Sequence, residues 1–202
     1  MLPFPQHKKS NGIPRVSSES SNGITTMTTL PIIREARTSD LPRITEIYAY
    51  HVLNGLASFE EAAPDEIEMT RRFHSLQEKR MPYYVAELDG IVMGYAYAGP
   101  YRERIAYRYT VENSVYIAPD GQGKGLGGAL MDIIIDRCSA LGLRQMVSVI
   151  GDSANQASIA LHKSRGFRMV GTLEAPGFKF GQWVDSILMQ RALGEGKDTL
   201  PE

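Results

Sequence analysis

Asp120-Gly-Gln-Gly-Lys-Gly-Leu-Gly-Gly128 is the stretch that most restricts the fold of this chain, because it joins a strand pattern to a long helix pattern. Glycine lets the backbone approach a ligand closely and adopt positive φ angles. The free N–H groups and the dipole at the start of a helix favour an anion there. The stretch therefore predicts a socket for a pyrophosphate, which Lys124 also approaches. A glycine-rich turn without a ligand is the alternative.

Two other phosphate-binding motifs compete for the same glycines. A Walker A loop is excluded, because position 118 is Ala and position 125 is Gly. A dinucleotide-binding fingerprint fits Gly123-x-Gly125-x-x-Gly128, with Asp152 at a suitable distance for a ribose contact. That fingerprint usually opens a βαβ fold, whereas a full set of helices and a hairpin precede these glycines, so a dinucleotide is disfavoured.

The chain ahead of the glycines predicts a strand, two helices and a run of antiparallel strands. Ser39 and Asp40 offer an N-cap for the first helix. Asp89-Gly90 is a strong signal for a two-residue hairpin turn. The elements are expected at residues 32–37, about 41–53, about 65–79, 84–88, 91–97 and 111–117.

The chain from the glycines onward alternates helices with strands. Gly142 is expected to end the first of these helices as a C-cap, and Gly166 to stop the second. The elements are expected at 125–141, 146–150, 155–165, 168–173 and 184–190. This order predicts one mixed α/β (α+β) domain over residues 31–194. Residues 1–30 are expected to form a flexible tail or extension, and 195–202 a C-terminal tail.

Composition excludes several classes of function. The 202 residues carry a formal net charge of −1, so no global field attracts nucleic acid or an anionic membrane. No apolar run approaches the ~20 residues that span a bilayer, and no secretory h-region is present, so we expect a cytoplasmic protein. The single Cys138 follows Leu130 and Ile134 at helical spacing, which favours a packed thiol over a nucleophile. No metal site is expected.

Two motifs at the right separation identify a family. Gln122-Gly-Lys-Gly125-Leu-Gly127 resembles the Arg/Gln-x-x-Gly-x-Gly/Ala signature of the GCN5-related N-acetyltransferases (GNAT). Asn155-Gln-Ala-Ser-Ile-Ala-Leu161-His-Lys-Ser-Arg-Gly166-Phe167 resembles their Asn-x-x-Ala-x-x-Leu-Tyr-x-x-x-Gly-Phe segment. The resemblance implies a single domain with a mostly antiparallel twisted sheet between helices. It also implies acetyl-CoA as co-substrate, with the glycine loop at its pyrophosphate.

Further segments narrow the resemblance to the phosphinothricin-type acetyltransferases, over roughly residues 32–193. That family acetylates the α-amine of glutamate-like amino acids, and some members act on methionine sulfone and sulfoximine. The resemblance therefore implies a small-molecule amine substrate and a homodimer. The segments that carry it are Asp89-Gly90, Tyr97-Ala-Gly-Pro-Tyr101, Thr110-Val-Glu-Asn-Ser-Val-Tyr116, Val149-Ile-Gly151 and Gly177-Phe-Lys-Phe-Gly-Gln-Trp183.

Acyl transfer needs a group that removes a proton from the amine. Glu112 lies inside an otherwise apolar strand pattern, where burial would raise the pKa of its carboxylate; a solvent-facing strand residue is the alternative. The resemblance implies that Glu112 is the base. His162 stands where many superfamily members have a Tyr near the departing sulfur, so a proton donor, a substrate ligand and a structural residue all stay open.

The resemblance also implies contacts along the cofactor. Backbone groups of the strand would pair with the pantetheine arm, and the Asn155 amide would contact the same arm, although Asn155 fits a plain N-cap as well. The expected cofactor-binding residues are Val115, Tyr116, Ile117, Gln122, Gly123, Lys124, Gly125, Leu126, Gly127, Gly128 and Asn155.

An amino-acid substrate brings a carboxylate, which the forked donors of Arg102 and Arg104 suit; exposed, solvated arginines are the alternative. The remaining expected members of the amine pocket are Phe59, Tyr107, Glu112, Asn113 and Ser114. A GNAT enzyme for another amine, a polyamine or a peptide is an alternative function. A module that binds acetyl-CoA or a dinucleotide without catalysis is another.

Overall fold

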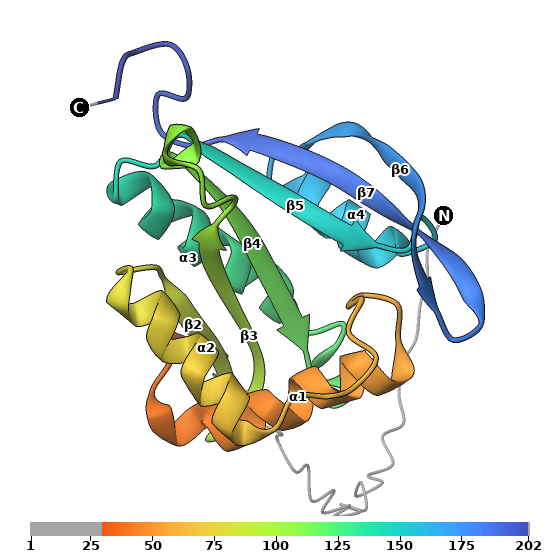
Figure 1. Ribbon diagram of the computed structural model, residues 1–202. Coiled ribbons are helices and arrows are strands. Elements are labelled where there is room, and N and C mark those ends of the chain that lie inside the picture. Colours follow the sequence, from red (N-terminus) through yellow and green to blue (C-terminus); the bar gives the residue numbers. More distant parts are fainter. Residues whose placement is uncertain (1–29, 202) are drawn as a thin grey trace, which may run out of the picture.

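A computed structural model describes residues 30–201 of the chain. Of the expected N-terminal tail, only Leu30 falls within this part, so the prediction for residues 1–29 lies outside the described residues. Figure 1 shows the arrangement of the helices and strands along the chain.

The described chain forms a seven-stranded sheet in the order β1-β2-β3-β4-β5-β7-β6. Neighbouring strands are antiparallel except for β4 and β5, which are parallel. The predicted mixed α/β class with a mostly antiparallel sheet is therefore confirmed. The strands are β1 Ile32–Glu35, β2 Tyr83–Leu88, β3 Ile91–Pro100, β4 Thr110–Ile117, β5 Gln145–Gly151, β6 Arg168–Lys179 and β7 Gln182–Ala192.

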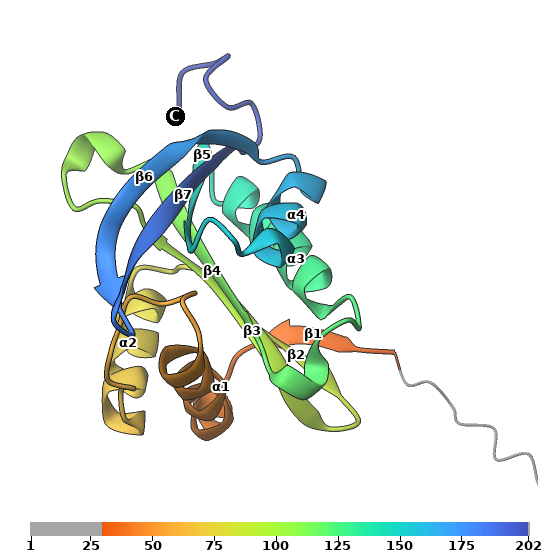
Figure 2. The same cartoon turned by 90° about the vertical axis from the view of Figure 1, so that its right-hand side faces the viewer.

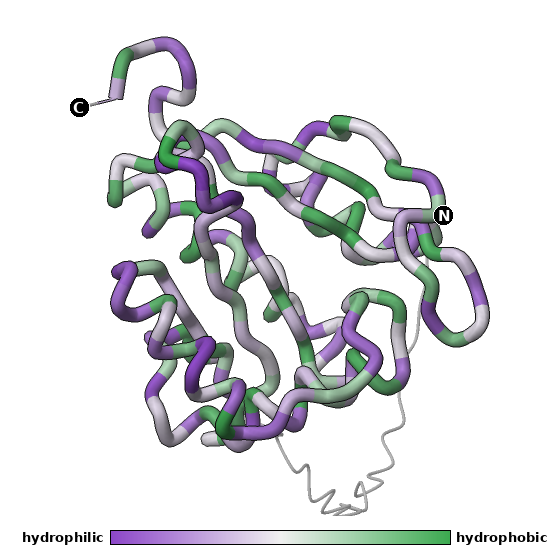
Figure 3. The backbone as a smooth tube through the Cα atoms, viewed as in Figure 1, coloured by the Kyte–Doolittle hydropathy of each residue, from purple (hydrophilic) through white to green (hydrophobic). Residues whose placement is uncertain are grey.

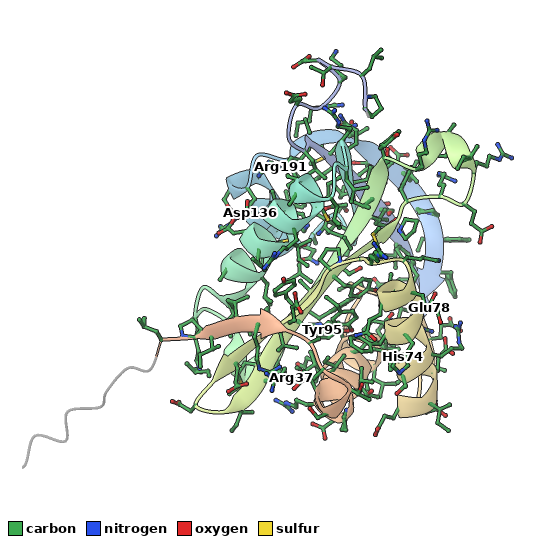
Figure 4. The ribbon with its side chains drawn as sticks, turned by 90° about the vertical axis from the view of Figure 1, so that its left-hand side faces the viewer. Arg37, His74, Glu78, Tyr95, Asp136 and Arg191 are labelled. Atoms are coloured by element: carbon green, nitrogen blue, oxygen red, sulfur yellow. The ribbon has the colours of Figure 1, made fainter. Side chains whose placement is uncertain are left out.

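Within residues 30–201, four α-helices cover the two faces of the sheet (Figure 2). Helices α1 (Leu41–Asn54) and α2 (Glu66–Glu78) pack on one face, and α3 (Leu126–Ala140) and α4 (Gln156–Ser164) on the other. Tyr95 is fully buried between the sheet and α1 and α2 (Figure 4). Strand β5 is mostly hydrophobic, as expected for a strand near the centre of the sheet (Figure 3).

The hairpin between β2 and β3 has the predicted turn. Leu88 pairs with Ile91, which leaves Asp89 and Gly90 as the two turn residues. Their φ angles are 52° and 78°, and positive φ at both central residues is what a tight right-twisted hairpin requires.

Asp40 occupies the N-cap position of α1, as expected, but does not cap the helix with its side chain. Its side chain makes no cap hydrogen bond, and Thr38–Asp40 form a short 3₁₀ turn instead. The carboxylate accepts from Arg34 at 2.7 and 2.9 Å and from the Arg37 backbone N–H at 2.8 Å. These hydrogen bonds lower the pKa of Asp40 and tie the start of α1 to β1. Because the Arg34 guanidinium binds the Asp40 carboxylate, the carboxylate does not accept from the N–H groups at the start of α1.

The last two strands are longer than the sequence predicts. The sequence pattern predicts strands at 168–173 and 184–190. The structure continues β6 to Lys179 with a register shift between Leu173 and Gly177, and Ala175 has a φ of 51°. Because β6 is the outermost strand, its free edge tolerates a proline and this irregularity.

Candidate active site

The parallel strands β4 and β5 separate part-way along their length (Figure 1). They pair at only three positions, ending at Glu112 opposite Val147. Beyond that point β4 continues to Ile117 beside β3, and β5 continues to Gly151 beside β7. One side of β4 therefore has backbone groups with no β5 partner over residues 113–117.

A cavity of about 720 Å³ lies between the ends of these strands, the glycine turn and α4. It brings together all but one of the residues expected to bind the cofactor. Lys124 is the exception, because it is exposed and does not line this cavity. The expected residues on the wall are Val115, Tyr116, Ile117, Gln122, Gly123, Gly125, Leu126, Gly127, Gly128 and Asn155.

The glycine turn presents the start of α3 to this cavity. Gly123 and Gly125 have φ angles of 73° and 76°, and a Cβ at either position would meet no atom within 4 Å. Gly125 is the residue before the first turn of α3, and no side chain caps that end of the helix. The first N–H groups of α3 therefore lack a side-chain acceptor, and the helix dipole makes this end attractive to an anion.

Arg165 is the cationic wall residue that sequence reasoning missed. Its guanidinium contacts the Asp132 carboxylate at 3.2 Å. It also lies across the start of α3, because a Cβ on Gly128 would fall 2.0 Å from Arg165 Nη2. Apart from His51, no other Lys, Arg or His side chain of the described residues lines the cavity. The sequence pattern marked Arg165 only as the end of a helix before Gly166, and Lys124 in the glycine-rich loop was the cation assigned to the pyrophosphate instead.

Helix α1 and the loop after it supply the opposite wall. His51 Nε2 lies 2.9 Å from the carbonyl oxygen of Ile117, to which it donates. Gly55, Leu56 and Ala57 complete this wall. Gly151, at the end of β5, approaches the loop so closely that a Cβ there would lie 2.2 Å from Leu56 O. No local motif marked this contact, since the residues are about a hundred positions apart in sequence.

Asn155 has the N-cap role that its position suggested. Its Oδ1 accepts from the Ser158 backbone N–H at 3.2 Å, and α4 begins at the next residue. Asn155 also lines the cavity, together with Asp152 and Ser158. The cap therefore fixes the end of α4 that faces the cavity.

Glu112 lies at the point where β4 and β5 part. Burial raises the pKa of its carboxyl group, and the positive charge of Arg102 offsets part of that rise. The raised pKa agrees with the expectation that an apolar strand would partly bury this carboxyl group. Gly99 is the β3 partner of Glu112, so no β3 side chain lies directly opposite the carboxylate.

The residues expected to bind the substrate carboxylate lie in the exposed segment between β3 and β4. The Arg102 guanidinium stacks over the Tyr101 ring at 5.0 Å, and Tyr107 packs edge-on against the same ring at 5.8 Å. Arg104 is exposed in this segment. Neither arginine lines the 720 Å³ cavity, although Arg102 is near enough to affect the pKa of Glu112.

Phe59, Ser114 and Asn113 lie in different surroundings. The Phe59 ring packs on β6, where a Cβ on Gly177 would fall 2.1 Å from it, and the side chain is 41% exposed. Ser114 pairs with Tyr97 across β3 and β4, on the same face as Glu112. Asn113 points to the other face and is buried beside His162.

Other chemistry-bearing groups stand apart from the cavity. Cys138 is fully buried in α3, and burial raises the pKa of its thiol to about 12, which confirms a packed rather than nucleophilic cysteine. Within residues 30–201, no group of three His, Cys, Asp or Glu side chains is arranged to hold a metal ion. None of the helices in that part of the chain has the length and apolar character to cross a membrane.

Comparison with known proteins gives consistent matches. The family model for the acetyltransferase (GNAT) domain matches residues 33–188. A phosphinothricin N-acetyltransferase of Alcaligenes faecalis is 52% identical over 170 residues, which are 84% of this chain and 86% of that protein. An L-methionine sulfoximine/L-methionine sulfone acetyltransferase of Salmonella typhimurium is 40% identical over 163 residues, 81% and 95% of the two chains.

A solved structure matches as well. The crystal structure of a GNAT superfamily phosphinothricin acetyltransferase from Sinorhizobium meliloti, in complex with acetyl-CoA, superposes with a TM-score of 0.83. The two sequences are 48% identical, and the match covers 87% of this chain and 94% of the other.

Proposed function

Because this chain belongs to the acetyltransferase (GNAT) domain family and is an N-acetyltransferase that uses acetyl-CoA, we propose that it acetylates the α-amine of a small glutamate- or methionine-like amino acid. The observation that carries the proposal is the 720 Å³ cavity at the separation of β4 and β5. It joins an anion-binding helix start to the free backbone groups of β4, and the half-buried Glu112 carboxylate lies further along the same strand, outside the cavity lining. A phosphate-bearing thioester needs this combination.

The pyrophosphate of acetyl-CoA is assigned to the start of α3, where Gly123, Gly125 and the uncapped N–H groups face the cavity. Arg165 supplies the positive charge on that wall. The pantetheine arm runs along Val115–Ile117 and pairs with the free edge of β4 as an added strand would. The Asn155 amide contacts the same arm while it caps α4.

Glu112 acts as the base. An α-amino group is mostly ammonium at neutral pH, and Glu112 or a water bound to it removes one proton. The free amine then attacks the thioester carbon, a C–N bond forms, and the C–S bond breaks. The nitrogen loses a second proton, the CoA sulfur gains one, and the products are the amide and CoA-SH. The raised pKa of Glu112 brings its basicity closer to what proton transfer at neutral pH requires.

The amino-acid carboxylate is assigned to Arg102 and Arg104, whose segment follows β3 beside Glu112. Phe59, Tyr107 and Ser114 complete the amine pocket. Two arginines near this end of the sheet favour an acidic small molecule over a cationic polyamine. The matches to amino-acid acetyltransferases support the same choice.

We also propose that the chain acts as a homodimer in the cytoplasm. Strand β6 is an edge strand, and the β6–β7 hairpin exposes large apolar side chains along its length. Exposed apolar side chains on an edge strand favour pairing with another chain. The exposed apolar residues are Met169, Val170, Leu173, Phe178, Phe180 and Trp183.

An acetyl-CoA consumption assay over a panel of amino acids, polyamines and a peptide tests the function. We expect turnover of phosphinothricin, methionine sulfone or methionine sulfoximine, and a rate at least about 100-fold lower for the Glu112→Gln variant. Acetyl-CoA affinity should stay unchanged in that variant. Turnover of a polyamine or peptide but of no α-amino acid would refute the substrate assignment, and an unaffected rate in Glu112→Gln would refute the base.

A further inference from the structure

The point where β4 and β5 part is held by side chains instead of backbone bonds. The last backbone-paired residues are Glu112 and Val147. At the next position along each strand, Ser148 Oγ donates a hydrogen bond to Asn113 Oδ1. Both residues are buried, with exposed fractions of 5% for Asn113 and 1% for Ser148. This side-chain hydrogen bond therefore extends the contact between β4 and β5 by one residue, at the point where the gap between the strands begins.

His162 joins this link from helix α4. Its Nδ1 lies 2.8 Å from the carbonyl oxygen of Ser158, which can only accept, so Nδ1 carries the hydrogen. Burial lowers the pKa of the imidazole, which favours the neutral ring. Its Nε2 is then an acceptor, and Asn113 Nδ2 donates to it at 3.0 Å. Both ring nitrogens are therefore occupied by groups of this chain.

The amide of Asn113 is fully used as well. One of its hydrogens goes to His162, and Met131 Sδ lies 3.3 Å from the same nitrogen. Its oxygen accepts from Ser148. A buried polar cluster in which every member is satisfied fixes the relative positions of its elements, because any shift would leave a buried group unpaired.

Nothing charged competes for His162. The ring packs edge-on against Phe167 at 5.1 Å and lies against β4 through Asn113 and against its own helix through Ser158. Within residues 30–201, no carboxylate, lysine or arginine forms a hydrogen bond or ion pair with it. The ring is also 3% exposed.

We propose that Asn113, Ser148 and His162 form a positioning unit that sets the angle between β4, β5 and α4, and so places the acetyl thioester opposite Glu112. The inference rests on the proposed function. It gives His162 the role of a neutral acceptor for Asn113, not of the proton donor to the departing sulfur. Of the three elements that the unit joins, β4 and α4 line the cavity, and Glu112 is the neighbour of Asn113 in β4.

Substitutions separate the two roles of His162. Glutamine carries an oxygen able to accept from Asn113 but cannot act as an acid. We expect His162→Gln to keep a kcat within about tenfold of the wild type, and His162→Ala to lose about 100-fold, as a misplaced reacting group does. Equal loss of kcat in both variants, with folding and acetyl-CoA binding intact, would overturn the proposal in favour of a proton donor.

Ser148→Ala removes the link between the strands without touching an ionisable group. We expect kcat to fall about 10-fold or more while the KM for the amine changes little, because the gap is altered at the thioester and not at the amine. Ser139→Ala is the matched control, since Ser139 Oγ donates to Ile135 O within α3, away from the gap. Wild-type kcat in Ser148→Ala would refute the positioning role.

A spectroscopic test does not depend on activity. Nitrogen-15 NMR of the imidazole in the wild-type protein should show the Nδ1–H tautomer and a titration of His162 at lower pH than that of a free histidine. Asn113→Asp should create a charged partner and make the ring protonate at higher pH than in the wild type. An Nε2–H tautomer or an ordinary titration in the wild type would refute the unit, whichever amine the enzyme acetylates.

Discussion

The ammonium group of Lys179 lies 2.7 Å from the backbone oxygen of Ser58, although 121 positions separate the two residues in sequence. The same nitrogen donates to Gly55 O at 2.9 Å. Lys179 is 1% exposed, and burial lowers the pKa of its side chain. The β6–β7 hairpin therefore holds the loop between α1 and α2, which forms one wall of the cavity (Figure 2).

Lys179→Met should release this loop. Two carbonyl oxygens lose their donor, and we expect the free energy of unfolding to fall by about 2 kcal/mol. The KM for the amine should rise, since Phe59 belongs to the same loop. Urea unfolding and steady-state kinetics measure the two effects. Lys197→Met is the control, because Lys197 is exposed; equal stability of the two variants would show that the Lys179 bonds contribute nothing.

Glu112→Gln should stabilise the protein while it inactivates the enzyme. Burial raises the folded-state pKa of Glu112 above the model-compound value of 4.5, so the wild type loses stability as the pH rises from that value through the folded pKa. Glutamine removes this loss, and the melting temperature at pH 7 should be higher in the variant. Thermal melts at pH 4 and pH 7 give the test: the difference between the proteins should shrink at pH 4.

The same carboxyl group should set the acidic limb of the pH profile. If Glu112 is the base, kcat/KM rises with pH as the carboxyl group ionises, with an apparent pKa above 4.5. Arg102→Ala removes the charge that offsets the burial effect, so the limb should move to higher pH. An acidic limb at the same pH in Arg102→Ala and the wild type would contradict an effect of the Arg102 charge on the pKa of Glu112.

Gly125→Ala should weaken acetyl-CoA binding. The φ angle of Gly125 is 76°, a conformation that costs a residue with a Cβ about 1–2 kcal/mol. Relaxation of that strain would move the first N–H groups of α3, and the KM for acetyl-CoA should rise. Gly171→Ala is the matched control, because Gly171 has no positive φ and open space around it. A similar KM in both variants would argue against the glycine turn as the phosphate site.

Arg165→Gln and Lys124→Gln test which cation holds the cofactor. Loss of a charge-assisted hydrogen bond to phosphate should raise the KM for acetyl-CoA about 10-fold in Arg165→Gln. Lys124→Gln should have a smaller effect, since Lys124 does not line the cavity. A short acetyl thioester without phosphates should be used equally well by the wild type and Arg165→Gln. A larger rise in the KM for acetyl-CoA in Lys124→Gln than in Arg165→Gln would identify Lys124 as the phosphate ligand instead.

Much of the fold follows from local sequence signals. Asp89-Gly90 predicted its hairpin, and the glycine stretch predicted the start of α3 within one residue of Leu126. These predictions succeed because turn chemistry and helix periodicity are local. The N-cap position of Asp40 was predicted correctly, but its side chain makes no capping hydrogen bond because Arg34, in another element, binds the carboxylate. Such competition is decided by tertiary contacts.

The site was predictable where a motif carries the chemistry and not where distant segments meet. The glycine turn, Asn155 and the backbone of Val115–Ile117 line the cavity as expected. Arg165 and the Gly55–Ala57 loop do not belong to any short pattern, because their place depends on how α4 and α1 pack. Asn113 and Ser114 were both assigned to the amine pocket. Because successive side chains of a strand point to opposite faces, the sequence already indicated that only one of these two neighbours could face that pocket.

The early separation of β4 and β5 has a consequence for how the protein responds to its surroundings. Without a ligand, the amide hydrogens of residues 113–117 that face the gap should exchange with solvent faster than those bonded to β3. A thioester lying in the gap would protect them and bind the folded chain alone, so resistance to unfolding should grow with the logarithm of free acetyl-CoA concentration. The lifetime of the protein in a cell would then follow the supply of acetyl groups.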